Sequence, residues 1–547
     1  MGEILLNKPG KKIILLGNEA IVRGALEEGV NFVSSYPGTP ASEIGDTFFR
    51  IAKSAGVYFE YSTNEKVALE AAIGASFSGL KTLVAMKDFG INVCLDALGP
   101  FVYTGTKGPT VIVVADDPSC HSSAQWEECT RGISYLTHIP TLEPSDPQEC
   151  LDFTKLAFQI SEKFKIPVMI RTTTRVAHQK MPVKLGAIKI TSPRLVGGKF
   201  VKDPHQFVTL PPRVLEMKKE LLEKIEKIKE FSEKNPINQI CTGPTRANSG
   251  IITSGISYLY VMEALKEIGL NLPVLKIGFF YPLPEKKIKY FVKNLKKVLV
   301  VEELEPYLEK EVERLAKDIN PKLQISGKDL IPEVGELKPE IVTLAIAKFT
   351  GKKYQIPNTK YQISVPKRFP QLCAGIPKRG SCPYWLVISA VKKAVDPKKV
   401  IFGGDIGCYM LFGTPLLNIQ DYLSCMGSSV GIAHGIKKAT QQKLITFIGD
   451  STFFHAGIPA LINTVFNKSN PLIIILDNQT TAMTGHQPHP GVNGIKIEDI
   501  VRACGVKNLK VIDPINQKEF TNTVKEFLNK KEVSVIVARR PCIWIKK

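Results

Sequence analysis

The 547-residue sequence predicts an α/β protein composed of three doubly wound domains. Short apolar segments of strand length alternate with amphipathic segments of helix length. This alternation is typical of a parallel sheet that helices cover on both faces. Two stretches rich in Lys and Pro interrupt it. The chain is also too long for one hydrophobic core, because domains usually contain about 100–200 residues.

The first predicted domain covers residues 1–190. Gly, Pro or Asp bounds each of its apolar runs, and helical spacing fills the segments between them. The predicted buried strands are Ile13–Gly17, Phe32–Ser35, Thr82–Met86, Thr110–Ala115 and Val168–Arg171. Residues 191–237 form a connector, in which apolar residues recur at helical spacing among Lys and Glu from Val214 to Glu233. We expect a solvated connecting helix there.

Two further domains follow the connector. Residues 238–350 carry predicted strands at Gly250–Thr253, Val274–Ile277 and Val298–Val301 and no cluster of reactive groups, so we expect a structural role. Residues 351–370 form a second linker rich in Lys and Pro. The last domain, residues 371–547, has predicted strands at Leu444–Ile448, Pro471–Leu476, Leu509–Ile512 and Ser534–Ala538. It holds most of the candidate functional residues.

The composition favours a soluble cytoplasmic protein. Hydrophobic residues make up 44% and charged residues 23% of the chain, which is ordinary for a globular protein. The net charge of +20 comes from scattered Lys without a basic tail, so we expect anionic substrates or an acidic redox partner and no nucleic acid. The apolar runs at residues 13–16 and 472–476 are too short for a signal peptide or a membrane helix. The 11 dispersed cysteines indicate a reducing compartment.

Polar residues follow two neighbouring strands of the last domain. Gly449 and Asp450 end one strand, and Asn478 ends the next, 28 positions after Asp450, which leaves room for one crossover helix. Both ends then lie at the carboxyl edge of the sheet, where open α/β sheets bind ligands. Mg²⁺ prefers oxygen ligands, and the Asp450 carboxylate, the Asn478 amide oxygen and the Thr480 carbonyl supply them. Gly449 lets a phosphate approach the backbone closely.

This pattern resembles the Gly-Asp-Gly…Asn-Asn signature of thiamine diphosphate enzymes, although Ser451 and Asp477 depart from it. Longer runs resemble the α-subunit family of indolepyruvate ferredoxin oxidoreductases, which are thiamine diphosphate-dependent 2-oxoacid:ferredoxin oxidoreductases. The runs are GDIGCY at 404–409, CMGSSVGIAHG at 425–435, GDSTFFHAGIP at 449–459 and LDNQTTAMTGHQPHP at 476–490. The likeness extends over essentially the whole chain.

The resemblance implies a fold, cofactors and binding residues. Residues 1–190 would form a pyrimidine-binding domain, 371–547 a diphosphate- and Mg²⁺-binding domain, and 238–350 a transketolase C-terminal-like domain between them. Thiamine diphosphate and Mg²⁺ would be the cofactors. The implied cofactor-binding residues are Glu65, Asp405, Gly407, Cys408, Gly427, Ser428, Ser429, Gly449, Asp450, Ser451, Asn478 and Thr480.

Glu65 is the candidate for the acid that activates the cofactor. Read locally, Asn64 is a good helix N-cap, and a Glu in the first turn is favoured by the helix dipole alone. The run NEKVALE at 64–70, preceded by SYPGTP at 35–40, resembles the pyrimidine-binding domain of the family. The resemblance implies that Glu65 shares its proton with the aminopyrimidine ring and that Thr39 contacts substrate or cofactor.

The remaining polar residues have weaker assignments. His486 lies on a Pro- and Gly-rich loop after the Mg²⁺ strand, and we hypothesise that it contacts the 2-oxoacid. His434 and His455 lie in apolar helical surroundings, where packed or hydrogen-bonded histidines are the usual case. Asp116 and Asp117 follow a strand and favour a solvated turn over a metal site.

The cysteine pattern departs from the family. Its α subunit usually ends in a ferredoxin-like domain with C-x₂-C runs, whereas this sequence ends where that domain would start and has no C-x₂-C pair. The family's Cys-Pro-Gly-Cys run appears here as Cys373-Ala-Gly-Ile376. Cys373, Cys408 and Cys542 would remain as ligands of a [4Fe–4S] cluster, with Cys382 as a replacement for the fourth. Ordinary buried thiols are the alternative.

Three functions are compatible with these residues. The favoured one is oxidative decarboxylation of a 2-oxoacid, an arylpyruvate by the resemblance, to an acyl-CoA. Electrons would pass to ferredoxin or a ferredoxin-like subunit, with a smaller partner subunit in a hetero-oligomer. The second is non-oxidative decarboxylation or aldehyde transfer. The third is a non-catalytic cofactor-binding subunit, which the combination of Glu65, Asp450 and Asn478 disfavours.

Overall fold

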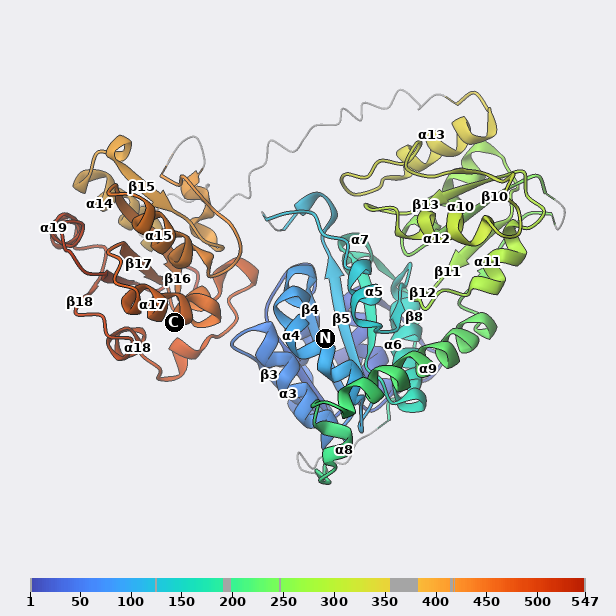
Figure 1. Cartoon of the computed structure of the whole chain (residues 1–547), viewed down its shortest axis with the longest axis horizontal. Coiled ribbons are helices and arrows are strands. Elements are labelled where there is room, and N and C mark those ends of the chain that lie inside the picture. Colours follow the sequence, from blue (N-terminus) through green and yellow to red (C-terminus); the bar gives the residue numbers. More distant parts are fainter. Residues whose placement is uncertain are drawn as a thin grey trace. The chain divides into compact units, whose positions relative to one another are not determined.

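The structure is a computed structural model. It describes residues 2–122, 125–189, 198–244, 247–354, 382–413, 417 and 419–545. The chain divides into two compact units, Met1–Lys360 and Tyr361–Lys547 (Figure 1). The predicted linker at 351–370 lies outside the described residues from position 355 onwards.

A seven-stranded sheet forms the centre of the first unit. Its strand order is β12-β6-β7-β5-β4-β2-β3, and every neighbouring pair is parallel except β12 and β6. The strands are β2 (Phe32–Ser35), β3 (Tyr58–Tyr61), β4 (Thr82–Lys87), β5 (Thr110–Asp116), β6 (Thr141–Leu142), β7 (Val168–Thr173) and β12 (Phe279–Tyr281). The central strands β5 and β7 are buried at every position, as expected for a doubly wound parallel sheet.

Helices connect these strands. They are α1 (Gly17–Glu27), α2 (Ser42–Ala55), α3 (Glu65–Phe77), α4 (Asp88–Thr104), α5 (Arg131–Thr137), α6 (Pro147–Phe164) and α7 (Thr174–His178). Each of α2, α3, α4 and α7 begins within a few residues of the carboxyl end of a strand. The helix N-termini therefore line the carboxyl edge of the sheet, where open α/β sheets bind ligands.

The expectation of a buried parallel strand at Ile13–Gly17 was wrong. The strand is present as β1 (Lys12–Leu16), but it pairs antiparallel with β8 (Lys180–Lys184) in a separate two-stranded sheet. Its residues alternate between exposed and buried positions, and Ile14 is 68% exposed. Only one face of this small sheet is covered, so alternate side chains face the solvent.

A second, five-stranded sheet follows in the same unit, in the order β14-β13-β10-β11-β9. Its strands are β9 (Gln239–Ile240), β10 (Ser249–Ser254), β11 (Val274–Ile277), β13 (Lys297–Val301) and β14 (Gln324–Ser326). The helices of this part of the chain are α10 (Ser257–Ile268), α11 (Glu285–Val292), α12 (Tyr307–Ala316) and α13 (Pro339–Thr350). β12 comes from this part of the chain but joins the first sheet. β12 therefore links this part of the chain to the seven-stranded sheet.

The connecting helix is confirmed as α9 (Arg213–Lys234), preceded by the short α8 (Pro204–Phe207). Met217, Leu221, Ile225 and Ile228 are buried along one face of α9. The rest of the helix carries the Lys and Glu residues of the pattern. The helix is therefore solvated on one side only and packed on the other.

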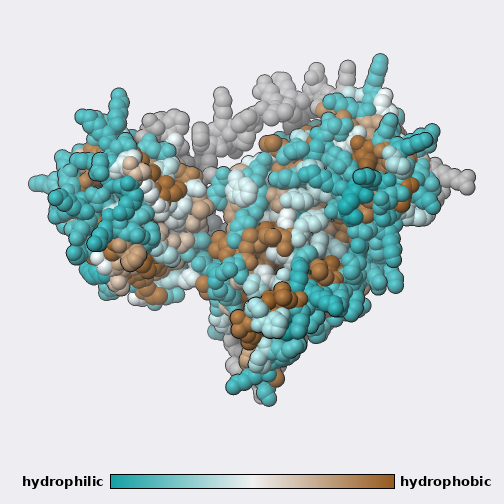
Figure 2. All heavy atoms as spheres, viewed as in Figure 1, coloured by the Kyte–Doolittle hydropathy of each residue, from teal (hydrophilic) through white to brown (hydrophobic). Residues whose placement is uncertain are grey.

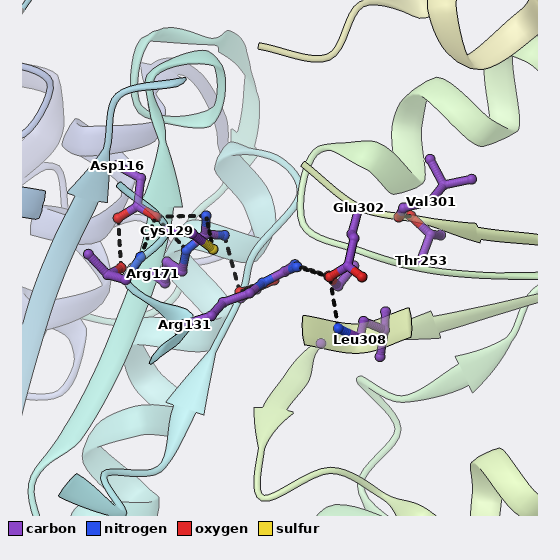
Figure 3. Close-up of polar contacts among 12 residues, drawn as sticks. Asp116, Cys129, Arg131, Arg171, Thr253, Val301, Glu302 and Leu308 are labelled. Carbon is purple, nitrogen blue, oxygen red and sulfur yellow. Dashed lines mark hydrogen bonds and ion pairs between the residues drawn. The ribbon is translucent and has the colours of Figure 1, made fainter. Parts of the chain in front are cut away.

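A buried ion-pair network joins the two sheets of the first unit (Figure 3). Arg131 donates from Nε and Nη2 to both carboxylate oxygens of Glu143, at 2.8 and 2.7 Å, and from Nη1 to Glu302 at 2.5 Å. Arg171 donates from Nε to Asp116 at 2.7 Å. Burial alone would raise the pKa of Glu143, but Arg131 and Arg171 hold it down at about 2. The network ties Glu302, which follows β13, to residues of the first sheet.

The second unit contains one parallel five-stranded sheet, in the order β15-β16-β17-β19-β18. Its strands are β15 (Val400–Gly403), β16 (Lys443–Gly449), β17 (Leu472–Asp477), β18 (Asn508–Ile512) and β19 (Ser534–Arg539). Its helices are α14 (Pro383–Ala394), α15 (Ser428–Ala439), α16 (Asp450–Thr452), α17 (Ile458–Phe466), α18 (Ile497–Ala503) and α19 (Gln517–Phe527). The four predicted strands are confirmed, and β15 was missed. The fold is α/β throughout, as expected.

The face of the molecule in Figure 2 is mostly hydrophilic, and its apolar residues form small, separate patches. Among the described residues, no helix is both long and apolar enough to cross a membrane.

Candidate functional site

Glu65 is the first residue of α3, and its side chain is buried where the helix begins. Asn64 caps the helix, because its Oδ1 accepts a hydrogen bond from the Val67 N–H at 2.8 Å. Glu65 is 6% exposed. Gly90 of α4 makes room for it, since a Cβ atom on Gly90 would lie 2.7 Å from Glu65 Cγ. The sequence therefore builds a buried acid at the positive end of a helix.

The loop of residues 37–40 follows β2 and contacts residues at the ends of β4 and β5. The Thr39 carbonyl accepts a hydrogen bond from Ser122 Oγ at 2.9 Å. A Cβ atom on Gly38 would lie 2.9 Å from Lys87 Cγ, and Lys87 is the last residue of β4. Glu65 packs against the first turn of α4, which begins immediately after Lys87. Glu65 and the Thr39 loop thus meet at the same β4–α4 junction.

The expectation of a solvated turn at Asp116 and Asp117 was wrong, because both residues are buried. Asp116 accepts hydrogen bonds from Arg171 at 2.7 Å and from Thr130 Oγ1 at 2.7 Å. Asp117 accepts one from Ser122 Oγ at 2.7 Å. Both carboxylates are therefore used to hold the loop after β5 in place. Nothing in the sequence near Asp116 revealed its partner Arg171, which is 55 positions away.

Two further acids in this region were missed by sequence reasoning. Burial raises the pKa of Asp88 to about 7 and that of Glu128 to about 8, and the neighbouring carboxylate of Asp116 adds to both shifts. Glu128 accepts a hydrogen bond from Asn92 Nδ2 at 2.9 Å. Such shifts depend on tertiary burial, which residue spacing does not show.

In the second unit, three oxygen atoms converge at the ends of two adjacent strands. Asp450 follows β16 and Asn478 follows β17, and these strands pair in parallel, so the predicted adjacency is confirmed. Asn478 Oδ1 lies 2.7 Å from the Thr480 carbonyl oxygen and 3.0 Å from Asp450 Oδ2. Asp450 is 3% exposed and accepts hydrogen bonds from the N–H groups of Ser451 and Gln479 at 2.7 and 2.8 Å. A set of ligands made of oxygens alone fits Mg²⁺.

The orientation of the Asn478 amide depends on a buried tyrosine. Asn478 Nδ2 lies 2.8 Å from the hydroxyl oxygen of Tyr384, a residue of α14. With the reverse orientation, Nδ2 would donate to Asp450 and Thr480, and Oδ1 would accept from Tyr384. Without a cation only the reverse orientation satisfies the amide, because the first one places Oδ1 against two acceptor oxygens. The Tyr384 hydroxyl suits either orientation, since a tyrosine hydroxyl both donates and accepts. A cation at the three oxygens selects the first orientation, because only Oδ1 can bind it.

Of the two loop histidines, His489 and not His486 contacts the predicted metal ligand. His489 Nε2 lies 3.0 Å from Asp450 Oδ2, and His489 Nδ1 accepts a hydrogen bond from the Gly491 N–H. His486 is exposed, and its backbone N–H donates to the Thr481 carbonyl. Its contact with a substrate stays a prediction. His486 and His489 are three positions apart on the same loop, and the sequence does not show which of them reaches Asp450.

The other two histidines of the unit behave as expected. His434 Nδ1 lies 2.8 Å from Ser469 Oγ, and His455 is 6% exposed.

Asp405 organises the turn that precedes α15. Its two carboxylate oxygens accept hydrogen bonds from the N–H groups of Gly427 and Ser429, at 2.8 and 2.9 Å. Burial raises the pKa of Asp405, whereas these hydrogen bonds lower it. A diphosphate contact by Gly427 or Ser429 would therefore use atoms other than these N–H groups. Gly427 has φ 85°, and a Cβ atom there would lie 2.5 Å from Ala456 Cβ, so only glycine fits this turn.

The structure brings several cysteines close to the same strand ends. Cys408 lies in a 3₁₀ turn after β15, and the Cys542 N–H donates to the Asn478 carbonyl at 3.0 Å. Cys382 precedes α14. Cys373 lies outside the described residues. Among the residues that the structure does describe, no three His, Cys, Asp or Glu side chains form a metal-binding group, so a cluster stays a prediction.

Two family models match the chain. The model described as "Pyruvate flavodoxin/ferredoxin oxidoreductase, thiamine diP-bdg" matches residues 23–233, which contain Thr39 and Glu65. The model described as "Thiamine pyrophosphate enzyme, C-terminal TPP binding domain" matches residues 400–538, which contain Asp405, Asp450 and Asn478.

Similar proteins cover nearly the whole chain. Indolepyruvate oxidoreductase subunit IorA of Methanothermobacter thermautotrophicus is 43% identical over 560 residues, which cover 99% of this chain and 88% of the relative. The same subunit of Pyrococcus horikoshii is 44% identical over 571 residues, with 98% and 87% coverage. A solved 2-oxoglutarate:ferredoxin oxidoreductase from Magnetococcus marinus aligns with a TM-score of 0.51 at 20% identity, over 62% of this chain and 65% of that one. This last likeness shows the fold.

Proposed function

Because the chain belongs to the family of indolepyruvate oxidoreductase subunit IorA, we propose that it is the catalytic subunit of an enzyme that oxidatively decarboxylates arylpyruvates such as indolepyruvate. The two matched models support thiamine diphosphate as its cofactor. The observation that carries the proposal is that one matched segment contains a buried acid, Glu65, and that the other contains the oxygen cluster at Asp450 and Asn478.

Glu65 is the residue that we assign to activation. When bound, thiamine diphosphate supplies a carbanion that adds to the 2-oxo group and an electron sink for the electrons left after CO₂ departs. Glu65 gives and takes the proton at the aminopyrimidine ring. Its position at the start of α3 keeps the carboxyl group fixed and largely shielded from water. Thr39, at the same β4–α4 junction, would orient the 2-oxoacid.

Asp450, Asn478 and the Thr480 carbonyl would hold Mg²⁺ through their oxygens. Gly449 and Ser451 flank Asp450 on the backbone. Asp405 fixes the turn of Gly427, Ser428 and Ser429, and it also accepts a hydrogen bond from the N–H of Ile406, which precedes Gly407 and Cys408. These residues would position the diphosphate, and His486 would close over the substrate from the loop after β17.

The proposed reaction needs electron carriers and partners. A 2-oxoacid and CoA give an acyl-CoA, CO₂, one proton and two electrons. The electrons pass one at a time to two ferredoxins or to a ferredoxin-like subunit. A [4Fe–4S] cluster at Cys373, Cys408 and Cys542 would carry them within this chain. A smaller subunit would complete the hetero-oligomer, and we place the reaction in the cytoplasm.

One observation favours a second function. The Cys-Pro-Gly-Cys run of the family has Ile376 at its second cysteine, and Ile cannot bind iron. Without a cluster, the same cofactor chemistry ends in release of an aldehyde or its transfer to an acceptor. Non-oxidative decarboxylation is therefore the alternative.

The decarboxylation step is tested by Glu65→Gln in the complex purified with this chain. The variant keeps the size of the side chain but cannot exchange the proton, so we expect CO₂ release from carboxyl-labelled indolepyruvate to fall by at least about 100-fold. Far-UV circular dichroism should be unchanged.

The matched control is Glu70→Gln on the same helix, which removes the exposed partner of Lys66. It should release CO₂ at the wild-type rate. Wild-type activity in Glu65→Gln would refute the role of Glu65.

A further inference from the structure

An aromatic pair lies beside the β4–α4 junction and has no role in the assignments above. The rings of Phe89 and Trp126 are parallel, with an interplanar angle of 5° and centroids 6.3 Å apart. Phe89 is the second residue of α4, and Trp126 belongs to the segment after β5. Trp126 is 58% exposed. A large aromatic side chain that is held in a stack and still exposed offers a free ring face to a ligand.

The pair is next to the loop that faces the substrate in the proposed function. Lys87 lies between the aromatic pair and this loop. Its aliphatic carbons pack on Gly38, and its Nζ lies 4.4 Å from the centroid of the Phe89 ring. On the other side, Ser122, four positions before Trp126, bonds to the Thr39 carbonyl. The stack, the cation and Thr39 therefore border one region at the ends of β2, β4 and β5.

The two residues that follow Trp126 are held by hydrogen bonds. Glu127 accepts hydrogen bonds from the N–H groups of Ser119 and Gly335, at 2.5 and 3.0 Å. Glu128 accepts one from Asn92 at 2.9 Å. The chain that follows Trp126 is thus tied to α4 and to the loop before α13.

Lys87 supplies a positive charge beside the aromatic pair, in a region that also holds the carboxylates of Asp88, Asp116 and Asp117. Lys87 Nζ lies 3.5 Å from Asp88 Oδ1, and the Lys87 side chain is 13% exposed. Burial raises the pKa of Asp88 to about 7. Asp88 therefore offsets the charge of Lys87 only in part near neutral pH. An arylpyruvate has a carboxylate at one end and a planar apolar ring at the other, with the reacting ketone between them.

We propose that Phe89 and Trp126 form the platform on which the aryl ring of the 2-oxoacid stacks, with Lys87 binding its carboxylate. This subsite makes the proposed function specific for aromatic substrates and rests on that function. Aliphatic 2-oxoacids share the carboxylate contact but have no ring to stack.

The test compares kcat/KM for indolepyruvate and for an aliphatic 2-oxoacid such as 2-oxoisovalerate, in the intact complex. In Trp126→Leu, which keeps apolar bulk but removes the ring, the ratio of the two values should fall about three- to tenfold. Trp126→Phe should restore most of the ratio. Lys87→Gln should raise KM for both substrates. The control Tyr290→Leu, at an aromatic residue that is 75% exposed on α11, should leave the ratio unchanged.

The outcomes separate this subsite from the proposed function. If the wild type decarboxylates indolepyruvate and Trp126→Leu keeps the wild-type ratio with a wild-type melting temperature, the platform is overturned and the proposed function stands. If the wild type prefers the aliphatic acid, the platform is also overturned. If the wild type releases CO₂ from neither acid, the proposed function fails and the platform falls with it.

Discussion

The amide of Asn478, a proposed Mg²⁺ ligand, is oriented by one buried hydroxyl. Its amide lies between two oxygens on one side, from Asp450 and Thr480, and the Tyr384 hydroxyl on the other. Burial raises the pKa of Tyr384 well above its usual value, so the hydroxyl stays protonated. It can accept from Nδ2 when a cation holds Oδ1, and it can donate to Oδ1 when no cation is bound. Tyr384 thus acts as a positioning residue for the proposed Mg²⁺ ligand.

We predict that Tyr384→Phe weakens metal binding roughly tenfold, the range seen when a partner of a metal ligand is removed. The amide then loses the acceptor that stabilises its cation-binding orientation. Binding of Mn²⁺ in place of Mg²⁺, followed by electron paramagnetic resonance in the presence of thiamine diphosphate, measures the change without relying on turnover.

The matched control for this prediction is Tyr422→Phe. Tyr422 is in the same unit, and its hydroxyl donates to the Ser429 carbonyl at 3.1 Å instead of to Asn478. The Tyr422→Phe variant should change Mn²⁺ affinity by less than about twofold. Equal losses in both variants would show that Tyr384 has no special effect on Asn478.

At the scale of elements, Arg131 joins α5 to both sheets of the first unit. It is 2% exposed and contacts Glu143 and Glu302. Glu302 in turn accepts a hydrogen bond from the Leu308 N–H at 2.9 Å (Figure 3). It accepts another from the Glu309 N–H at 2.8 Å, also in the first turn of α12. Loss of the cation would leave the buried carboxylate of Glu302 without its guanidinium partner and Glu143 with Arg171 alone. This is far more costly than loss of an exposed pair.

Arg131→Met should therefore destabilise the first unit by about 3–5 kcal/mol. Arg502→Met, which removes an exposed pair with Asp499, should cost less than about 1 kcal/mol. Urea unfolding of the two variants measures both values. A loss below about 1 kcal/mol in Arg131→Met would mean that the network does not hold the two sheets together.

Glu128 makes the stability of the same unit depend on pH. Its pKa in the folded protein is about 8, mainly because of burial, whereas an unfolded chain has about 4.3. The folded state therefore holds a proton that the unfolded state has released, and stability falls as the pH rises from about 4.3 to about 8.

Glu128→Gln stays neutral and can still accept from Asn92, so it should be more stable than the wild type at pH 8, by roughly 1–3 kcal/mol. The difference should vanish near pH 4. Melting curves from pH 4 to 9 test this, with the exposed Glu532→Gln as control. A difference that is constant over this range would contradict the raised pKa.

At the scale of the whole molecule, the sequence predicted what depends on local pattern. Apolar runs bounded by turn residues located β16 and β17, and the 28 positions between Asp450 and Asn478 correctly indicated adjacent parallel strands. The Asn64 cap correctly placed Glu65 in the first turn of a helix.

The sequence did not predict contacts made by residues far apart in the chain. Asp116 is buried because Arg171 neutralises it from β7, and Tyr384 reaches Asn478 from a helix 94 positions earlier. The strand at Lys12–Leu16 was misassigned because its sequence, KIILL, does not alternate between apolar and polar residues. The sequence therefore does not show that only one face of the strand is covered. Tertiary packing decides each of these cases.

The most direct test of the account is the product that the complete enzyme forms. The complex is purified anaerobically through a tag on this chain and given indolepyruvate, CoA, thiamine diphosphate, Mg²⁺ and oxidised ferredoxin. We predict that each CO₂ released is accompanied by one acyl-CoA and two reduced ferredoxins. Release of CO₂ with a free aldehyde and no reduced ferredoxin would contradict the oxidative function and establish the non-oxidative alternative.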